Sequence, residues 1–519
     1  MDAIETLRQE VQEGRITADR LVDLLASQQR LLQTTQQQLQ TTQQQLQSAR
    51  DRIEVLEKKW GDPSPTAKLD EPFSMRSEEK RQEARGKKDK PKGKRKGRRG
   101  RIKTKDKIAQ AERTERIFPE GIAPEKCRLS HVRTVWRLEN RRAVLIAYEI
   151  YRSPNKQYGK IPGVLGRGEF GLEIITEIAF LVYSVGLSFD KVCRLLFFFQ
   201  NLKVTKSQAD ALLYRLARHW EREFDVLCTL LANSLVVHAD ETSWSLNSVW
   251  AFLSEKARVL LFGVPKDAET LKKILDPASF AGIVISDHAS VYDNFSAAQK
   301  CWAHLLRKAI KLTLQDPSHE DYRTFTDRLL EIYRAACRVQ RDQRLGDAGR
   351  AQKVALLEDE IFQLCTAKRF ADELVEGLEN DHRLLMSEVM RLMLQQELFT
   401  FVTAKPVQQP NGTTKPVAGT NNEAERTLRG AAEARKTGRT NKSGDGARRQ
   451  TVLTSVLESL RLYLPTFTLV SVIEELNRWW ASGRSCFEEL LQKLQLPEPQ
   501  SEQPIIDRIF PSPSPTPTG

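Results

Sequence analysis

Two aspartates stand where apolar strands are expected to end. Asp240 follows the run LVVHA, and Asp287 follows the run GIVIS. A carboxylate at the end of a buried strand needs a counter-charge or a metal ion, because burying it alone is costly. If the two strands pair, the carboxylates repel each other, and a divalent cation relieves the repulsion. These residues predict a site for Mg²⁺ (or Mn²⁺), with two ions about 4 Å apart, suited to in-line phosphoryl displacement.

A third acidic position lies in the segment TNNEAERTLRGAAEARK, which is expected to form a helix after a Pro/Gly/Thr-rich loop. Glu425 shares one face of this helix with Arg429 through their i, i+4 spacing. A metal-binding glutamate beside cationic side chains suits chemistry on DNA phosphates. Glu423 is an equally good candidate from the residues alone. The predicted DNA-binding residues of this helix are Arg426, Arg429, Arg435 and Lys436.

Each carboxylate also has an explanation that involves no chemistry. Either aspartate could cap the element that follows it, as Asp287 would at the start of a loop. Glu425 and Arg429 could form an ion pair on a solvated helix face. Glu241 is set aside as a ligand, because a continuing strand turns it to the face opposite Asp240.

The helical segment CWAHLLRK follows the second aspartate. Two residues of this segment, Trp302 and His304, could brace the site or contact DNA. His304 is not assigned as a zinc ligand, because no Cys or His accompanies it at the spacing of known zinc sites.

The elements that must position these side chains form an α/β pattern. Strand and helix signals alternate over residues 233–455, which predicts a catalytic domain with a helical insertion at about 303–400. Residues 121–232 predict a β-hairpin and helices compatible with a DNA-binding helix-turn-helix. C-terminal helices are expected at 456–496 and a disordered tail at 497–519.

The N-terminal region differs in composition from the rest of the chain. A leucine or isoleucine recurs every seven residues within 1–60, which predicts a coiled coil and a homo-oligomer; a polar Gln-rich tract is the alternative. Residues 61–120 predict a disordered basic linker. Of the net charge of +13, Gly86–Lys107 contributes 13 Lys/Arg against 2 acidic residues. Such a tract favours a polyanion, and its predicted DNA-binding residues are Lys94, Arg95, Arg98 and Arg99.

Three motifs in order resemble the IS66 family of bacterial insertion-sequence transposases. They are HADETSW, SDHASVY followed by CWAHLLRK, and NNEAERTLR. The resemblance covers about residues 125–480. It implies an RNase H-like fold whose DDE triad falls on Asp240, Asp287 and Glu425, and so selects Glu425 over Glu423.

The resemblance also implies an activity and partners. The expected activity is metal-dependent cleavage at element ends and strand transfer into target DNA, with accessory transposition proteins. The alternatives are a catalytically silent DNA-binding descendant and an RNase H-like nuclease without strand transfer. The expected location is the bacterial cytoplasm, at the nucleoid, since the chain begins without a signal-peptide pattern and has no apolar run of membrane-spanning length.

The chain departs from the family pattern at two places. Many members carry a cysteine-rich zinc-binding segment before the catalytic domain, and here only Cys127 stands in that region. Asp287 is followed by His288 and Ala289, where members often have Gly and Tyr.

Overall fold

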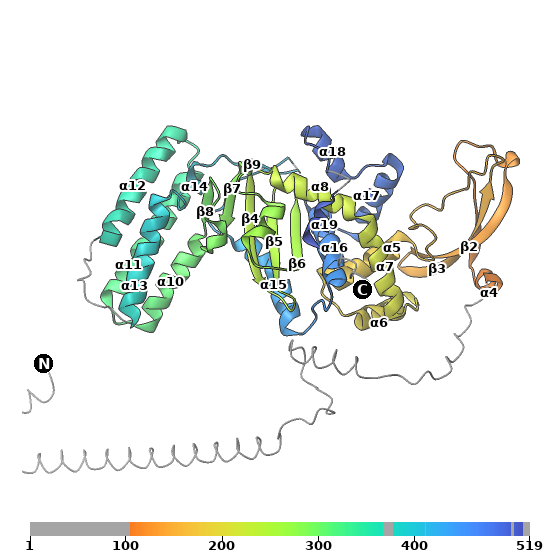
Figure 1. The fold of residues 1–519 in the computed structure, drawn as a ribbon, viewed down its shortest axis with the longest axis horizontal. Coiled ribbons are helices and arrows are strands. Elements are labelled where there is room, and N and C mark those ends of the chain that lie inside the picture. The colour runs from red at the N-terminus through yellow and green to blue at the C-terminus, as the bar shows by residue number, and fades with distance from the viewer. Residues whose placement is uncertain (1–103, 367–376, 411, 500–502, 512–519) are drawn as a thin grey trace, which may run out of the picture. The chain divides into compact units, whose positions relative to one another are not determined.

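A computed structural model describes residues 104–366, 377–410, 412–499 and 503–511 (Figure 1). The predicted coiled coil and the basic residues Lys94, Arg95, Arg98 and Arg99 lie outside the described residues. Among the described helices, none is long and apolar enough to cross a membrane.

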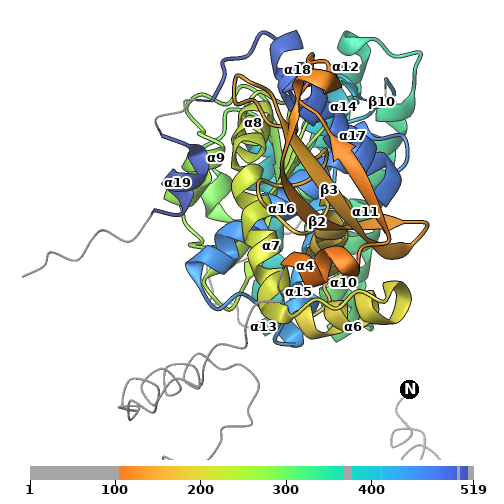
Figure 2. The same cartoon turned by 90° about the vertical axis from the view of Figure 1, so that its right-hand side faces the viewer.

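A three-stranded sheet with the order β1-β3-β2 opens the described part of the chain. β2 (Arg128–Glu139) and β3 (Arg142–Arg152) form the predicted hairpin (Figure 2). Its turn residues Asn140 and Arg141 both have positive φ, as a two-residue hairpin turn requires. The structure differs from the predicted linker before it, because α4 (Thr104–Ala109) and β1 (Arg113–Ile117) are regular, and β1 pairs in parallel with β3.

Five helical segments follow the hairpin, and several begin or end at a recognisable signal. The π-helical turn after α5 is followed by Gly186. Its φ of 75° is in the left-handed region, as is common for glycines that end helices. Ser188 caps α6 through the N–H of Lys191, and Thr205 forms a capping box with Gln208 at α7. The segments are α5 (Leu172–Ala179), η2 (Phe180–Ser184), α6 (Phe189–Gln200), α7 (Lys206–His219) and α8 (Glu221–Ala232).

The central sheet has the strand order β6-β5-β4-β7-β8. Only β5 runs antiparallel to its neighbours, because β4 pairs in parallel with β7 and β7 with β8. The strands are β4 (Val236–Ser243), β5 (Ser248–Ser254), β6 (Arg258–Val264), β7 (Ile283–Ser286) and β8 (Ala298–Lys300), with α9 (Ala268–Ile274) between β6 and β7 and η3 (Ser290–Tyr292) before β8.

The outer edge of β6 is closed by side chains of α16 (Gly444–Tyr463). Thr451, Ser455 and Ser459 recur every four residues along the helix. Their hydroxyls accept the N–H groups of alternate residues of β6 at 2.9–3.0 Å, which satisfies the unpaired edge. The predicted end of the catalytic domain at residue 455 falls inside α16. Because α16 bonds to β6 along its length, the whole helix belongs with the sheet.

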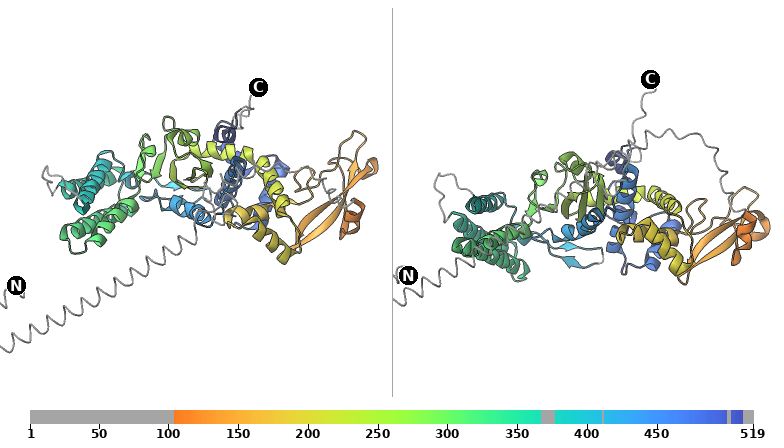
Figure 3. Two further views of the ribbon diagram at one scale, coloured as in Figure 1. Left: turned by 60° about the horizontal axis from the view of Figure 1, so that its bottom comes forward. Right: turned by 90° about the horizontal axis from the view of Figure 1, so that it is seen from below.

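The helical insertion has a hydrophobic core of its own. That core includes Val236 and Ile285 of the sheet. Figure 3 shows the helices of the insertion at one end of the sheet. Its helices are α10 (Trp302–Gln315), α11 (Glu320–Arg341), α12 (Asp347–Thr366), α13 (Gly377–Leu394) and α14 (Thr400–Thr403). The short strands β9 (Val407–Gln408) and β10 (Thr414–Lys415) and the helix α15 (Asn422–Lys436) follow.

A larger core joins α5–α8, the other face of the sheet and the C-terminal helices. Those helices are α17 (Leu469–Ser482), α18 (Cys486–Lys493) and α19 (Ile505–Ile509). α19 falls within the predicted disordered tail, yet Ile506 is buried and its N–H donates to Asp225. The helices after the hairpin therefore share one core with the sheet.

Candidate active site

Parallel pairing brings Asp240 and Asp287 to the same level of the sheet. The β4–β7 register aligns His238 with Ile285, and Asp240 and Asp287 each lie two residues further along the chain. Asp240 was expected at the end of its strand, but β4 continues to Ser243, because residues 241–243 stay paired with β5. Asp287 directly follows the end of β7, and its Oδ1 accepts the N–H of Ala289 at 3.0 Å. Both aspartates are half-buried. The capping role considered for Asp287 is therefore present, and it leaves the second carboxylate oxygen free of that bond.

The sheet face that carries Asp240 is the face covered by α15. Asp240 lies opposite Ala251 on β5, and Ala251 shares a small hydrophobic cluster with Leu428 and Ala431 of α15. Glu241 faces the other way, because its partner in the register is Trp250, which belongs to the core on the opposite face. Asp240 and Glu241 therefore point to opposite faces of the sheet, as predicted from the alternation of side chains along a strand.

Glu241 is also fully matched by partners of its own. Its side chain is 1% exposed, pairs with Lys266 at 2.5 Å and accepts the hydroxyl of Tyr292. The burial of Tyr292, followed by the charge of Glu241 and those of the two aspartates, raises the pKa of Tyr292 well above its ordinary value. Glu241 therefore has its charge balanced by protein groups.

Glu425 lies in the first turn of α15, and Asn421 fixes where that helix begins. Asn421 is completely buried, and its Nδ2 donates to the carbonyl of Ala239 on β4 at 2.8 Å. Its Oδ1 accepts a hydrogen bond from Nδ1 of His238 at 3.3 Å. The N–H of Glu425 closes the turn on the carbonyl of Asn421 at 3.2 Å. One buried amide thus ties the glutamate's helix to the strand that carries Asp240.

Asn421→Ala is expected to lower the free energy of unfolding by about 1–3 kcal/mol, because a buried carbonyl and a buried imidazole each lose a partner. Urea unfolding followed by circular dichroism measures this. Asn422→Ala is the matched control, since Asn422 is exposed, and it should change stability by no more than about 0.5 kcal/mol. Equal effects of the two substitutions would contradict the anchoring role of Asn421.

The electrostatics of Asp240 reflect the other two carboxylates. Burial, followed by the charges of Asp287 and Glu241, raises the pKa of Asp240 to about 7, and the charge of Glu425 adds to the rise. A carboxyl group with this environment lacks sufficient positive charge around it. The donor set consists of carboxylate oxygens, which suits Mg²⁺ or Mn²⁺. The residues therefore fit a divalent cation.

The two glutamates in the first turn of α15 have different surroundings. Glu423 pairs with Arg258 at 3.1 Å and with Lys415 at 2.6 Å, away from the aspartates. Burial alone would raise the pKa of Glu423, but its cationic partners, Lys415 first, lower it. Glu425 pairs with Arg307 at 2.7 Å, so the ion pair considered between Glu425 and Arg429 is replaced by a contact with α10.

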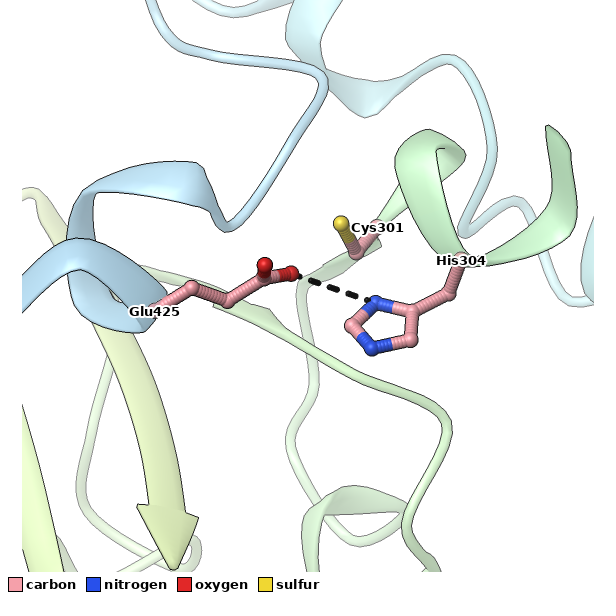
Figure 4. Close-up of side chains that lie close together, drawn as sticks. All are labelled: Cys301, His304 and Glu425. Carbon is pink, nitrogen blue, oxygen red and sulfur yellow. Dashed lines mark ion pairs between the residues drawn. The ribbon is translucent and has the colours of Figure 1, made fainter. Parts of the chain in front are cut away.

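Cys301 is a neighbour of Glu425 that the sequence did not indicate. Cys301, His304 and Glu425 each offer a potential ligand atom, and these atoms lie within 4.8 Å of one another (Figure 4). His304 Nδ1 is 3.6 Å from Glu425 Oε1. The fold therefore gives His304 two neighbours with potential ligand atoms, which the spacing in the sequence did not indicate. Trp302 is completely buried and donates to the carbonyl of Leu398 at 2.7 Å, so it braces the insertion and does not reach DNA.

The insertion also contacts the loop after Asp287. Glu388 on α13 accepts a hydrogen bond from His288 Nδ1 at 2.6 Å and pairs with Lys308 on α10 at 2.5 Å. Burial alone would raise the pKa of Glu388, but the hydrogen bonds from His288 and Lys308 lower it to about 2. The residue that departs from the family pattern, His288, thus links the insertion to the aspartate beside it.

The cationic side chains predicted to contact DNA are exposed along α15. They are Arg426, Arg429, Arg435 and Lys436. Arg435 also donates to the carbonyl of Ser243 at the end of β4, at 2.9 Å. The helix that carries Glu425 therefore also presents four cationic side chains to solvent.

One family model matches the chain. Its description is "Transposase IS66 family", and it matches residues 167–449, more than half of the sequence and all three carboxylates. No curated protein matches the chain.

Proposed function

The chain belongs to the IS66 family of transposases, and we propose that it is an active enzyme that cleaves DNA at the ends of an insertion sequence and joins those ends to target DNA. The observation that carries this proposal is the electrostatic coupling of acidic side chains from separate elements: burial, followed by the charges of Asp287 and Glu241, raises the pKa of Asp240 to about 7, and the charge of Glu425 adds to the rise. Carboxyl groups whose pKa values are displaced by burial and by one another are typical of functional sites.

We assign the catalytic domain to the RNase H-like fold. The order β6-β5-β4-β7-β8, in which the single antiparallel strand lies between β6 and β4, supports the assignment. The first aspartate on the central strand and the second after the adjoining parallel strand also support it.

Asp240, Asp287 and Glu425 are the residues that would hold Mg²⁺ or Mn²⁺, with two ions expected. The chemistry that bound ions would supply is activation of a water or a DNA 3′ hydroxyl and stabilisation of the leaving oxygen of the phosphodiester. The protein itself supplies orientation and charge. Asn421 fixes the distance between α15 and β4, and Glu388 restrains the loop beside Asp287.

Arg307 has a role that follows from its present partner. Its guanidinium binds the carboxylate of Glu425 and is 53% exposed. When a cation takes over Glu425, Arg307 is free to bind a DNA phosphate, for which its planar group is suited. Arg426, Arg429, Arg435 and Lys436 extend the proposed DNA surface, and homo-oligomerisation through residues 1–60 stays a prediction.

The catalytically silent descendant is the alternative with most in its favour, since DNA binding needs the cations alone. Against it stands the presence of acidic residues at all three positions, since the charges of Asp287 and Glu425 both raise the pKa of Asp240. A nuclease without strand transfer would use the same carboxylates, so only the products distinguish it.

Removal of the metal is expected to abolish cleavage. The full chain, incubated with duplexes that carry the ends of its element, should nick them in Mg²⁺ and leave them intact in excess EDTA. A supercoiled target plasmid in the same reaction should acquire joined ends. Binding of the duplexes without any cleavage in Mg²⁺ or Mn²⁺ would favour the silent descendant, and cleavage without joining would favour the nuclease.

A further inference from the structure

A sulfur, a nitrogen and an oxygen ligand meet at the start of α10. Cys301 is the residue before the helix, and His304 lies three positions later, so helical geometry turns both toward Glu425 on α15 (Figure 4). This set differs in chemistry from the all-carboxylate set of Asp240 and Asp287. Thiolate and imidazole are ligands that Zn²⁺ and Co²⁺ prefer and that Mg²⁺ does not.

The spacing of these atoms is close to that of a tetrahedral site. Bonds of about 2.0–2.3 Å to Zn²⁺ place neighbouring ligand atoms about 3.5 Å apart. His304 Nδ1 and Glu425 Oε1 are 3.6 Å apart. All three ligand atoms lie within 4.8 Å of one another, so small side-chain adjustments would bring them to the spacing of metal ligands.

The surroundings of Cys301 and His304 favour a metal ion, because the first is held in place and the second lacks a hydrogen-bond partner at one ring nitrogen. The N–H of Asn421 donates to Sγ of Cys301 at 3.1 Å, which fixes the sulfur beside α15. Nδ1 of His304 is buried and has no hydrogen-bond partner within the described part of the chain. An orphaned buried nitrogen is unfavourable, and coordination would satisfy it.

An ion has a route to this position. The side chains of His304 and Glu425 are 31% and 27% exposed, so the site opens on that side while Cys301 closes the other. Arg307, which pairs with Glu425, is mostly exposed and can release it.

We propose that Cys301, His304 and Glu425 form a site for a thiophilic divalent cation such as Zn²⁺. The cysteine releases its proton to solvent on binding, as thiol ligands do. Because Glu425 belongs also to the carboxylate triad, an ion bound here withdraws it from Mg²⁺ and inhibits DNA cleavage. This consequence rests on the proposed function, whereas the binding itself does not.

Binding is tested with Co²⁺ on the full chain, in the absence of DNA. A cysteine ligand produces a thiolate-to-cobalt charge-transfer band in the near ultraviolet, and Zn²⁺ should displace it. Cys301→Ser should remove the band, while Cys127→Ser, which changes a half-buried thiol elsewhere, should keep it. No band in the parent chain, or an unchanged band in Cys301→Ser, would overturn the proposal.

His304→Gln provides a second variant in case the serine does not fold. It should weaken Zn²⁺ binding by at least about 10-fold while keeping a folded chain by circular dichroism. An affinity equal to that of the parent would exclude His304 and with it the site.

The inhibition has a separate readout. In Mg²⁺, micromolar Zn²⁺ should inhibit end cleavage by the parent and by Cys127→Ser much more than by Cys301→Ser. Equal inhibition of all three chains would overturn the overlap with the triad. If the parent does not cleave DNA at all, the proposed function fails, and the cobalt band still decides the metal site.

Discussion

Asp240→Asn is expected to reduce DNA end cleavage by about 1,000-fold or more and to leave DNA binding unimpaired. The amide has the size of the carboxylate but removes one charged metal ligand from the centre of the sheet. Losing about 4 kcal/mol of transition-state stabilisation accounts for such a decrease. Single-turnover cleavage in Mg²⁺ and a binding assay in EDTA measure the two effects. Cleavage at the parental rate would show that Asp240 is not a ligand.

The same substitution should stabilise the metal-free protein at high pH. In the folded chain the pKa of Asp240 is raised from 3.8 to about 7 by burial and by Asp287 and Glu241. The unfolded chain therefore loses this proton first, and the folded state becomes progressively less stable between about pH 4 and 7. Asn cannot ionise, so its advantage of about 2–4 kcal/mol is complete above pH 7 and vanishes near pH 4.

Urea unfolding in EDTA at pH 8 and pH 4.5 measures that advantage. Glu433→Gln is the control, because it removes one charge from an exposed position of α15. It should change stability by no more than about 0.5 kcal/mol at either pH. A loss of stability in Asp240→Asn at pH 8 would mean that the carboxylate is stabilised by its neighbours, contrary to the proposed repulsion.

Local patterns were sufficient to predict that Asp240 and Asp287 come directly after apolar runs of two strands. Each follows an apolar run, and side-chain alternation along β4 separates Asp240 from Glu241 without knowledge of the fold. The predicted hairpin and the helical insertion rest on equally local signals. The structure contains all of these elements with small differences at their ends.

The supporting residues could not be predicted in this way. Asn421 and Ala239 are 182 positions apart, and His288 and Glu388 are 100 apart. Their contacts depend on how the insertion and α15 return to the sheet, and single polar residues on long helices carry no signal of that. Cys301 was missed as a companion of Glu425 for the same reason, at a separation set by the whole insertion.

Two short elements were missed because their composition resembles that of a solvated segment. β1 has the sequence RTERI, and its charges are matched across the sheet, as in the pair Arg113–Glu139 at 2.5 Å. α19 lies in a Pro/Ser-rich tail, yet Ile506 and Ile509 are buried. In both cases neighbouring elements, which the local sequence does not contain, provide the partners.

Glu425→Gln is expected to reduce cleavage by about 100-fold or more and to raise the Mg²⁺ concentration needed for half-maximal rate, because an amide is a much weaker ligand than a carboxylate. Glu423→Gln is the matched substitution two residues away. Its carboxylate binds Arg258 and Lys415, so its loss should cost about 1 kcal/mol of stability and leave the Mg²⁺ dependence unchanged.

The pair of variants decides a question that the residues of α15 leave open, since both glutamates lie in its first turn. Glu423 has two cationic partners, Arg258 and Lys415, whereas Glu425 has an exposed arginine that DNA can attract away. A carboxylate committed to two protein cations is a poor metal ligand, because binding an ion would leave both cations unpaired. If Glu423→Gln were the inactive variant and Glu425→Gln the active one, α15 would have to rotate on binding DNA, and Asn421, which anchors its first turn to β4, would have to release Ala239.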